Sequence, residues 1–368
     1  MKILIDARMY GLEHAGIGRY IERLVGELLI LDKENDYVVL LRKKYFDLLK
    51  LPENWKKILV DIPHYSFSEQ IKLPQILYNE KVDLVHFPHF NFPILYFGNF
   101  IITIHDLIKH TSKGLETTTR DPWLYWIKYF GYKLVFNQAV NRAVKIIVPS
   151  HFVKDDLSKE YRLSADKIEV TYEGVGKEFQ KVKNNQSKAT DPFFIYTGSV
   201  YPHKNIDRLI EAFKIINQIQ KISLVIVCSR NVFWERLEKK IKENKMEKII
   251  TLLGFVSDEE VRALYKKSQG LVFPTLSEGF GLPGLEAMAS ETIVICSKIP
   301  VLEEIYGSAA IYFNPLDTTD ISNKILGCLN LKPEERRLLI SKGLEQVKKY
   351  SWGKMAKETV ALYESLKP

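Results

Sequence analysis

Two glutamates, Glu278 and Glu286, enclose a glycine-rich stretch in the second half of this chain of 368 residues. Between them Gly279, Gly281 and Gly284 have the spacing G-x-G-x-x-G, after a strand-like apolar run and before a helical pattern. Glycines at such a place let a ligand approach the backbone N–H groups of a helix N-terminus, where a diphosphate or carboxylate can bind. Carboxylates accept hydrogen bonds from sugar and ribose hydroxyls. The pattern therefore predicts a site for a ligand with hydroxyls on either side of an anionic group.

A dinucleotide-dependent oxidoreductase is the rival interpretation, because the same glycine spacing marks nicotinamide- and flavin-binding loops. That fingerprint belongs to the first strand-turn-helix unit of its domain, with an acid near the end of the next strand. Here the match lies in the fourth such unit of its half of the chain. The acids that follow at a comparable distance, Glu303 and Glu304, come after Pro300 in a segment with a helical pattern. We therefore favour the first interpretation.

The composition, with 27% charged and 46% hydrophobic residues, is that of a globular protein. The N-terminus has no signal-peptide pattern, and the most apolar segment, 90–104, is short for a membrane span and interrupted by Pro93 and Gly98. Three widely spaced cysteines suggest neither a disulfide framework nor a cysteine zinc site, so a cytoplasmic location is expected. The net charge of +8 comes with interleaved lysines and glutamates, as in 236–248, which argues against nucleic-acid binding.

Short β-branched runs alternate with helical patterns along the chain, which predicts parallel α/β units. Strands are expected at 2–7, 37–41, 57–62, 83–87, 100–106, 145–150 and 167–174, and then at 193–200, 223–229, 249–256, 270–275, 292–297 and 309–314. The polar segment 181–192 separates these two series and is the expected linker. The predicted fold class is α/β with two Rossmann-like parallel-sheet domains, 1–180 and 181–353.

Some helices can be described further. The pattern in 205–220 places Ile206, Leu209, Ile210, Phe213 and Ile216 on one stripe, which predicts a buried face. Ser257 or Asp258 is expected to cap the helix that follows. Pro283 suits the first turn of the helix that begins in the glycine-rich stretch.

The ordered set of motifs resembles the retaining glycosyltransferases of family 4. Their hallmark is Glu, seven residues, Glu in a context much like SEGFGLPGLEAMA, and Glu278 and Glu286 have this spacing. The resemblance covers almost the whole chain. Its other matching segments are the glycine loop (11–28), the histidine motif (103–107), a strand, serine and helix (148–157), a strand, phosphate loop and helix (196–213), and a nucleotide-base loop (252–268).

The resemblance implies a GT-B fold, in which two Rossmann-like domains face each other across a cleft. It implies an acceptor-side first domain, a second domain that binds the nucleotide-sugar donor, and a C-terminal helix, 354–368, that packs back on the first domain. The activity implied is metal-independent transfer of a hexose, of mannose or glucose type, with retention and without a cofactor. The acceptor would be a glycan or a lipid-linked glycan, in the assembly of a cell-surface polysaccharide.

The resemblance also assigns site residues. Glu278 would hold the donor sugar, Lys204 would stabilise the departing diphosphate, and His105 would contact the sugar or the charge near it. The implied donor-binding residues are Gly16, Gly18, His203, Phe255, Val256, Gly279, Phe280, Gly281, Leu282, Pro283, Gly284 and Glu286. Many members have an arginine where this chain has His203, so the source of a second positive charge stays open between His203, Arg208 and Arg230. A catalytically silent relative used for binding is the alternative that this departure favours.

Three other features have a structural interpretation beside the functional one. His105 and Asp106 could simply end a strand, and Gly16 and Gly18 could form an ordinary βα turn; the family context favours function for both pairs. His86 and His89 could suggest a metal site, but a third ligand is missing from the pattern, so structural roles are favoured.

The segment 122–140 is an aromatic-rich helix candidate. Core packing is favoured for it, with Trp123, Trp126, Ile127 and Phe130 as a buried stripe. The alternative is an interfacial helix that, with Lys128 and Lys133, makes a peripheral contact with the inner face of a membrane.

Overall fold

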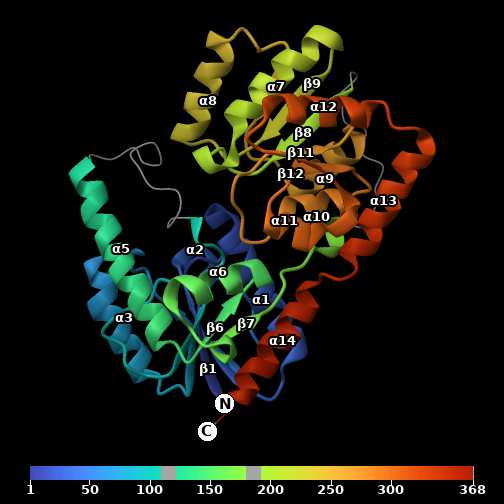
Figure 1. The fold of residues 1–368 in the computed structure, drawn as a ribbon. Helices are drawn as coiled ribbons and strands as arrows, with labels where there is room; N and C mark the ends of the chain where they lie inside the picture. Colours follow the sequence, from blue (N-terminus) through green and yellow to red (C-terminus); the bar gives the residue numbers. More distant parts are fainter. Residues whose placement is uncertain (109–121, 180–191, 368) are drawn as a thin grey trace. The chain divides into compact units, whose positions relative to one another are not determined.

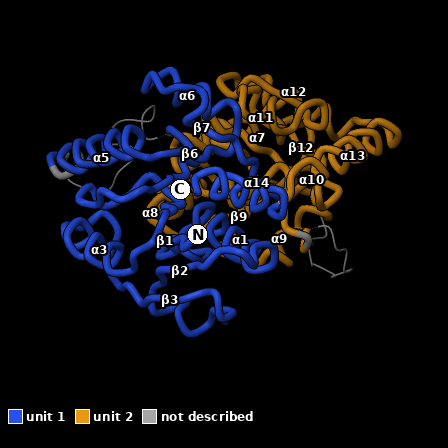
Figure 2. Tube along the Cα trace, turned by 90° about the horizontal axis from the view of Figure 1, so that it is seen from below, with its two compact units in different colours: residues 1–107, 120–174, 352–368 blue, residues 108–119, 175–351 orange. Residues whose placement is uncertain are grey.

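The computed structural model of the chain describes residues 1–108, 122–179 and 192–367 (Figure 1). The chain forms two compact units, coloured separately in Figure 2. Unit 1 comprises residues 1–107, 120–174 and 352–368, and unit 2 comprises 108–119 and 175–351. The division falls between Gly174 and Val175, ahead of the expected linker 181–192. Apart from Pro192, that linker lies outside the described residues.

Unit 1 is built on a seven-stranded sheet with the order β3-β2-β1-β4-β5-β6-β7. Its strands are β1 (Lys2–Asp6), β2 (Asp36–Leu41), β3 (Trp55–Leu59), β4 (Leu84–Phe87), β5 (Phe100–Thr103), β6 (Lys145–Val148) and β7 (Ile168–Val170). Each corresponds to one of the seven strand-like runs of the first half of the sequence. Every pair is parallel. All carboxyl ends therefore lie at one edge of the sheet.

Helices cover both faces of this sheet. Strand residues such as Leu4 and Val85 pack in one core with α3 (Phe67–Asn79), α5 (Pro122–Arg142) and α6 (His151–Tyr161). Because side chains alternate along a strand, residues such as His86 lie on the other face. There α1 (Ala15–Leu31) packs against α14 (Trp352–Ser365). The short helix α2 (Lys43–Phe46) follows β2.

Unit 2 has a six-stranded parallel sheet with the order β10-β9-β8-β11-β12-β13. Its strands are β8 (Phe193–Thr197), β9 (Ser223–Val227), β10 (Ile250–Leu253), β11 (Leu271–Phe273), β12 (Val294–Ser297) and β13 (Ala310–Phe313). Its helices are α7 (Ile206–Ile219), α8 (Val232–Glu243), α9 (Asp258–Lys267), α10 (Leu282–Ala289), α11 (Pro300–Tyr306), α12 (Thr318–Leu329) and α13 (Pro333–Val347). The predicted fold class, two Rossmann-like parallel sheets, is confirmed.

Two local features of unit 2, a buried helix face and a helix cap, form as the sequence predicts. The stripe from Ile206 to Ile216 on α7 is buried. Ser257 begins α9 with a capping box, in which its hydroxyl accepts from the N–H of Glu260 and the Glu260 carboxylate accepts from the N–H of Ser257. The sequence predicts these two helices because the apolar spacing and the cap both depend on residues close together in the chain.

The buried stripe expected on α5 is wrong. Trp123, Trp126, Ile127 and Phe130 are all exposed, between 55% and 74% of each residue. The core instead takes side chains from the second half of the helix, such as Phe136. The segment is apolar around much of its circumference, so its sequence did not reveal which side would meet the sheet. Among the residues that the structure describes, no helix is long and apolar enough to span a bilayer.

The C-terminal helix α14 returns to unit 1, as predicted. It packs along α1, and Figure 1 shows the two helices side by side. Trp352, Met355 and Tyr363 are buried there, although α14 is separated from the rest of unit 1 by the whole of unit 2. The core of unit 1 therefore includes the end of the chain.

We expect Met355→Ala to lower the free energy of unfolding of unit 1 by about 2–5 kcal/mol, because it leaves a cavity under α14. The control is Lys357→Ala, an exposed position of the same helix, which should change that free energy by less than about 0.5 kcal/mol. Chemical denaturation followed by hydrogen exchange in β1 and β4 measures both. Equal effects of the two substitutions would show that α14 is not part of this core.

Candidate functional site

Lys204 and Glu278 meet at the carboxyl edge of the unit 2 sheet. Lys204 ends a 3₁₀ turn, η5 (Pro202–Lys204), after β8, and Glu278 lies in the loop after β11. Strands β8 and β11 are neighbours where the strand order reverses, which is where open α/β sheets bind ligands. The Lys204 ammonium donates a hydrogen bond to the Glu278 carboxylate, and both side chains are nearly buried, at 13% and 11% exposure. The sequence predicted both residues for the site but not their pairing.

The 3₁₀ turn η5 is fixed to the loops after β11 and β13 by hydrogen bonds. Asn205 adopts a left-handed conformation with φ of 60°, and its side-chain amide donates to the carbonyl oxygens of Pro274 and Pro315 at 3.1 and 2.8 Å. The carbonyl oxygen of His203 accepts from the N–H of Leu276 at 2.8 Å. These bonds hold Lys204 beside Glu278 without using either side chain.

The surroundings of His203 disfavour a positive charge on its ring. Burial and the neighbouring Lys204 ammonium lower its pKa to about 3, so the ring is neutral. Arg230 is exposed and lies over the ring of Trp234 at 5.5 Å. Arg208, in the first turn of α7, donates to the Asn205 side chain at 2.9 Å. Of the three candidates left open by the sequence, Arg208 is therefore the cation held against η5.

The glycines of the G-x-G-x-x-G stretch have a packing reason. Gly281 caps α10 with a φ of +103°, and a Cβ on it or on Gly284 would overlap the ring of Tyr306. The Tyr306 hydroxyl donates to the carbonyl oxygen of Gly281. Pro283 lies in the first turn of α10, as predicted. The spacing that suggests a dinucleotide loop here makes room for a buried tyrosine.

The remaining donor-binding candidates of unit 2 differ in exposure. Glu286 lies within α10 and is half-buried, as is Leu282, and Gly279 is buried. The Phe280 ring is buried against Tyr350, with ring centres 5.6 Å apart, so it belongs to the core. After β10, Phe255 is 71% exposed and Val256 is half-buried. An exposed aromatic ring at the carboxyl edge suits stacking on a nucleotide base.

In unit 1, His105 lies just after β5, and the glycine loop leads into α1. Gly16 and Gly18 belong to the first turns of α1. A Cβ on Gly18 would overlap the carbonyl oxygen of Gly11, whereas the space around Gly16 is open. Gly18 is therefore required by close backbone packing. Gly16 has no such requirement from the described residues around it.

His105 and His86 are both held by hydrogen bonds within unit 1. His105 Nδ1 lies 3.1 Å from Glu173 Oε1, and its Nε2 lies 3.0 Å from the carbonyl oxygen of Pro88. The ring nitrogens of His86 contact the hydroxyls of Thr103 and Tyr363 at 2.9 and 2.6 Å. The structural role favoured for His86 is confirmed.

Sequence reasoning missed two buried charged groups of unit 1. One is Glu173, which follows β7 and holds His105. The other is Arg8, whose guanidinium donates to Asp6 and to Glu69, each at 2.7 Å. Asp6, Arg8 and Glu173 all come at or just after the carboxyl end of a strand. That placement was the signal available in the sequence.

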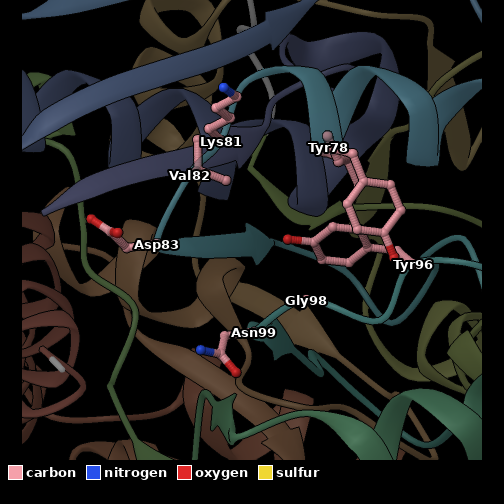
Figure 3. A pocket seen from close by; sticks show the side chains of 8 residues that line it. Tyr78, Lys81, Val82, Asp83, Tyr96, Gly98 and Asn99 are labelled. Atoms are coloured by element: carbon pink, nitrogen blue, oxygen red, sulfur yellow. The ribbon is translucent and has the colours of Figure 1, made fainter.

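A cavity of about 340 Å³ lies at the opposite edge of the unit 1 sheet. Figure 3 shows Asp83 and Asn99 before the amino ends of β4 and β5, and the rings of Tyr78 and Tyr96 next to each other. The two ring centres are 5.2 Å apart. None of the site residues predicted from the sequence lines this cavity. We therefore place the chemistry at the carboxyl edges.

Comparison with known proteins gives two matching families. The family described as Glycosyltransferase Family 4 matches residues 15–179, and the family described as Glycosyl transferases group 1 matches residues 177–346. The O-antigen chain mannosyltransferase RfbU of Salmonella typhimurium is 32% identical over 256 residues, which are 69% of this chain and 67% of that protein. The O-antigen chain mannosyltransferase B of Escherichia coli is 25% identical over 391 aligned positions, covering 100% of both chains.

Solved structures share the fold. Anabaena HepE, in complex with UDP and glucose, matches with a TM-score of 0.76 and 15% identity over 99% of this chain and 100% of that one. The sucrose-phosphate synthase of Thermosynechococcus elongatus matches with a TM-score of 0.75 and 20% identity over 99% and 98%. Their GT-B architecture agrees with the two parallel sheets described above.

Alanine substitutions at two glycines test the packing role of Tyr306. Their effects on the free energy of unfolding should have opposite signs. Gly284→Ala should lower the free energy of unfolding by about 1–3 kcal/mol, because the added methyl overlaps a buried ring. Gly327→Ala, in the last turn of α12 where no atom lies within 4 Å of the new methyl, should raise it by about 0.4–1 kcal/mol. Thermal and urea unfolding measure both. A tolerated alanine at position 284 would contradict the packing reason for the motif.

Proposed function

The chain belongs to glycosyltransferase family 4, and from that premise we propose that it transfers a hexose from a nucleotide-sugar to an acceptor hydroxyl with retention. The hexose is of mannose or glucose type, and mannose is favoured because the two O-antigen relatives described above are named mannosyltransferases. Their O-antigen names support a role in cell-surface polysaccharide assembly. The observation that carries the proposal is the pairing of Lys204 with Glu278 at the point where the strand order reverses.

Each end of the donor has a group suited to it in unit 2. The Glu278 carboxylate accepts hydrogen bonds from sugar hydroxyls, and Glu286, further along α10, accepts them from the ribose. Lys204 and the N–H groups at the start of α10 meet the diphosphate between them. Phe255 and Val256 contact the base. In unit 1, the family resemblance assigns His105, Gly16 and Gly18 to the reaction.

Catalysis in this proposal is electrostatic. The bond between the anomeric carbon and the diphosphate oxygen breaks, the acceptor oxygen bonds to the same carbon on the same face, and its proton passes to the departing diphosphate. Negative charge grows on that diphosphate, and a fixed ammonium with helix N–H groups stabilises it where water is excluded. The proposal therefore needs no metal ion and no cofactor.

A binding protein without activity is the second candidate. The neutral His203 favours it, because the diphosphate then meets one cation fewer beside Lys204. The two candidates differ in turnover and agree in nucleotide binding. A thermal-shift screen across UDP-, GDP- and ADP-sugars finds the nucleotide, since a ligand that binds the native state raises the melting temperature. Release of free nucleoside diphosphate in the presence of a glycan acceptor then separates the two.

We expect Glu278→Gln to bind GDP several-fold more tightly than wild type, because it removes the carboxylate that neutralises Lys204. The same variant should turn over GDP-mannose about 100-fold more slowly, since it loses charge-assisted hydrogen bonds in the transition state. Lys204→Ala should lose both GDP affinity and turnover. Calorimetry with GDP and assays of GDP release, all in EDTA, measure these effects.

Lys221→Ala, an exposed lysine of the same unit, is the matched control and should leave GDP affinity and turnover unchanged. Weaker GDP binding by Glu278→Gln would contradict the role of the ion pair. Activity that returns only when Mg²⁺ or Mn²⁺ is added back would contradict metal independence.

The exposed stripe on α5 supports a further part of the proposal, a peripheral membrane contact. Trp123, Trp126, Ile127 and Phe130 form an exposed apolar stripe, and Lys128 on the same turns is also exposed. Aromatic side chains beside lysines are typical of helices that lie in the interface of an anionic bilayer. Such a contact would bring unit 1 to a lipid-linked acceptor.

Sedimentation with vesicles tests this contact. The full chain should bind vesicles of phosphatidylcholine and phosphatidylglycerol, and the double variant Trp123→Ser, Phe130→Ser should lose about tenfold in binding, because interfacial binding scales with buried apolar area. Leu338→Ser removes an equally exposed apolar side chain from α13 and is the control. Equal binding by all three proteins would exclude the contact through α5.

A further inference from the structure

The hydrogen bonds of His105 define its charge. Its Nδ1 lies 3.1 Å from the carboxylate of Glu173, and its Nε2 lies 3.0 Å from the carbonyl oxygen of Pro88. A carbonyl oxygen and an ionised carboxylate can only accept hydrogen bonds. A neutral imidazole carries one N–H and could donate to one of them, leaving two lone pairs opposed at the other. The imidazolium donates to both, so the geometry selects the charged ring.

The groups around His105 also favour a positively charged ring. Glu173, on the segment after β7, is 6% exposed, so its own buried charge needs a partner. Asp106 is the next residue of the loop, and Tyr20, from α1, lies against the ring with centres 4.7 Å apart. Burial alone would favour the neutral ring, but the hydrogen bond and charge of Glu173, helped by Pro88 and Asp106, raise the pKa of His105.

His86, on the neighbouring strand β4, is held in the opposite state. Its partners are hydroxyls of Thr103 and Tyr363, which can donate or accept, so a neutral ring satisfies both. Burial, with the nearby His105 as the second cause, lowers the pKa of His86 to about 3. The partners of His86 therefore favour a neutral ring, whereas the partners of His105, which follows the adjacent strand β5, favour a charged one.

We propose that Glu173 is a positioning residue that holds His105 as an imidazolium, so that His105 serves the reaction as a fixed positive charge and not as a general base. Neither ring nitrogen is bare, and a general base needs a bare nitrogen. The use of this charge rests on the proposed function, in which the family resemblance assigns His105 to the reaction. The charge itself rests only on contacts within unit 1.

Nitrogen NMR of the full chain, labelled at histidine, reads this charge directly, with His105→Gln to identify the signal. Both nitrogens of an imidazolium carry protons, whereas a neutral ring shows one bare nitrogen. Across a pH titration, His105 should stay an imidazolium to a higher pH in wild type than in Glu173→Gln. The control Tyr363→Phe removes a partner of His86 but keeps Glu173, and should leave His105 charged.

The dependence of turnover on pH tests whether the reaction uses the positive charge of His105. With GDP-mannose as the donor, Glu173→Gln should lose at least about tenfold in turnover near pH 8 and less near pH 5.5, because the ring without its carboxylate partner takes up a proton only at lower pH. A variant with a merely distorted site would lose turnover equally at both values. His105→Gln should show the loss without the recovery.

The outcomes separate the inference from the proposed function. A bare nitrogen on His105 in wild type at neutral pH, or an unchanged titration in Glu173→Gln, overturns the inference. A charged ring with a rate profile that does not move overturns its use in the reaction. If the chain turns over no nucleotide-sugar, the proposed function fails, and the NMR titration still decides whether Glu173 holds the charge.

Discussion

All strand pairs in both units are parallel, and this constraint decides where chemistry can occur. Parallel strands end at one edge, so the loops that follow them gather there, and the reversal of strand order leaves room between two of those loops. In unit 2 the edge brings Lys204 to Glu278, which are far apart in sequence. In unit 1 it brings His105 to Glu173. The cavity at the amino edge of unit 1 collects none of these groups.

Each unit holds a basic side chain against a carboxylate at the carboxyl edge of its sheet. An isolated buried charge costs several kcal/mol, and a partner removes most of that cost. The Lys204–Glu278 pair is therefore stable without a ligand, but a ligand that enters between them must replace each partner. An anion suits the ammonium, and hydroxyls suit the carboxylate. A nucleotide-sugar carries both, which is the physical reason that this pair supports a transferase over a simple anion-binding protein.

Aromatic residues show how packing overrides local patterns. Tyr306 explains two glycines that resemble a cofactor motif, because its ring occupies the space where their Cβ atoms would be. Conversely, the aromatic face at the start of α5 has the spacing of a core helix and lies outside the core. In each case the identity of the contacting surface, which is distant in sequence, decides the role. The same holds for α14, whose buried face belongs to a sheet formed at the other end of the chain.

The sequence by itself determined the strands, the two-sheet fold class, the α7 stripe, the Ser257 cap and the residue types of the donor site, because these depend on local periodicity and on short motifs. Tertiary structure decided which charges pair, and so that the pKa of His203 is lowered, that His105 has two acceptors and that Glu173 is one of them. It also decided which side of α5 is buried. Pairing and burial depend on contacts between strands and helices that are distant along the chain, and no local pattern records them.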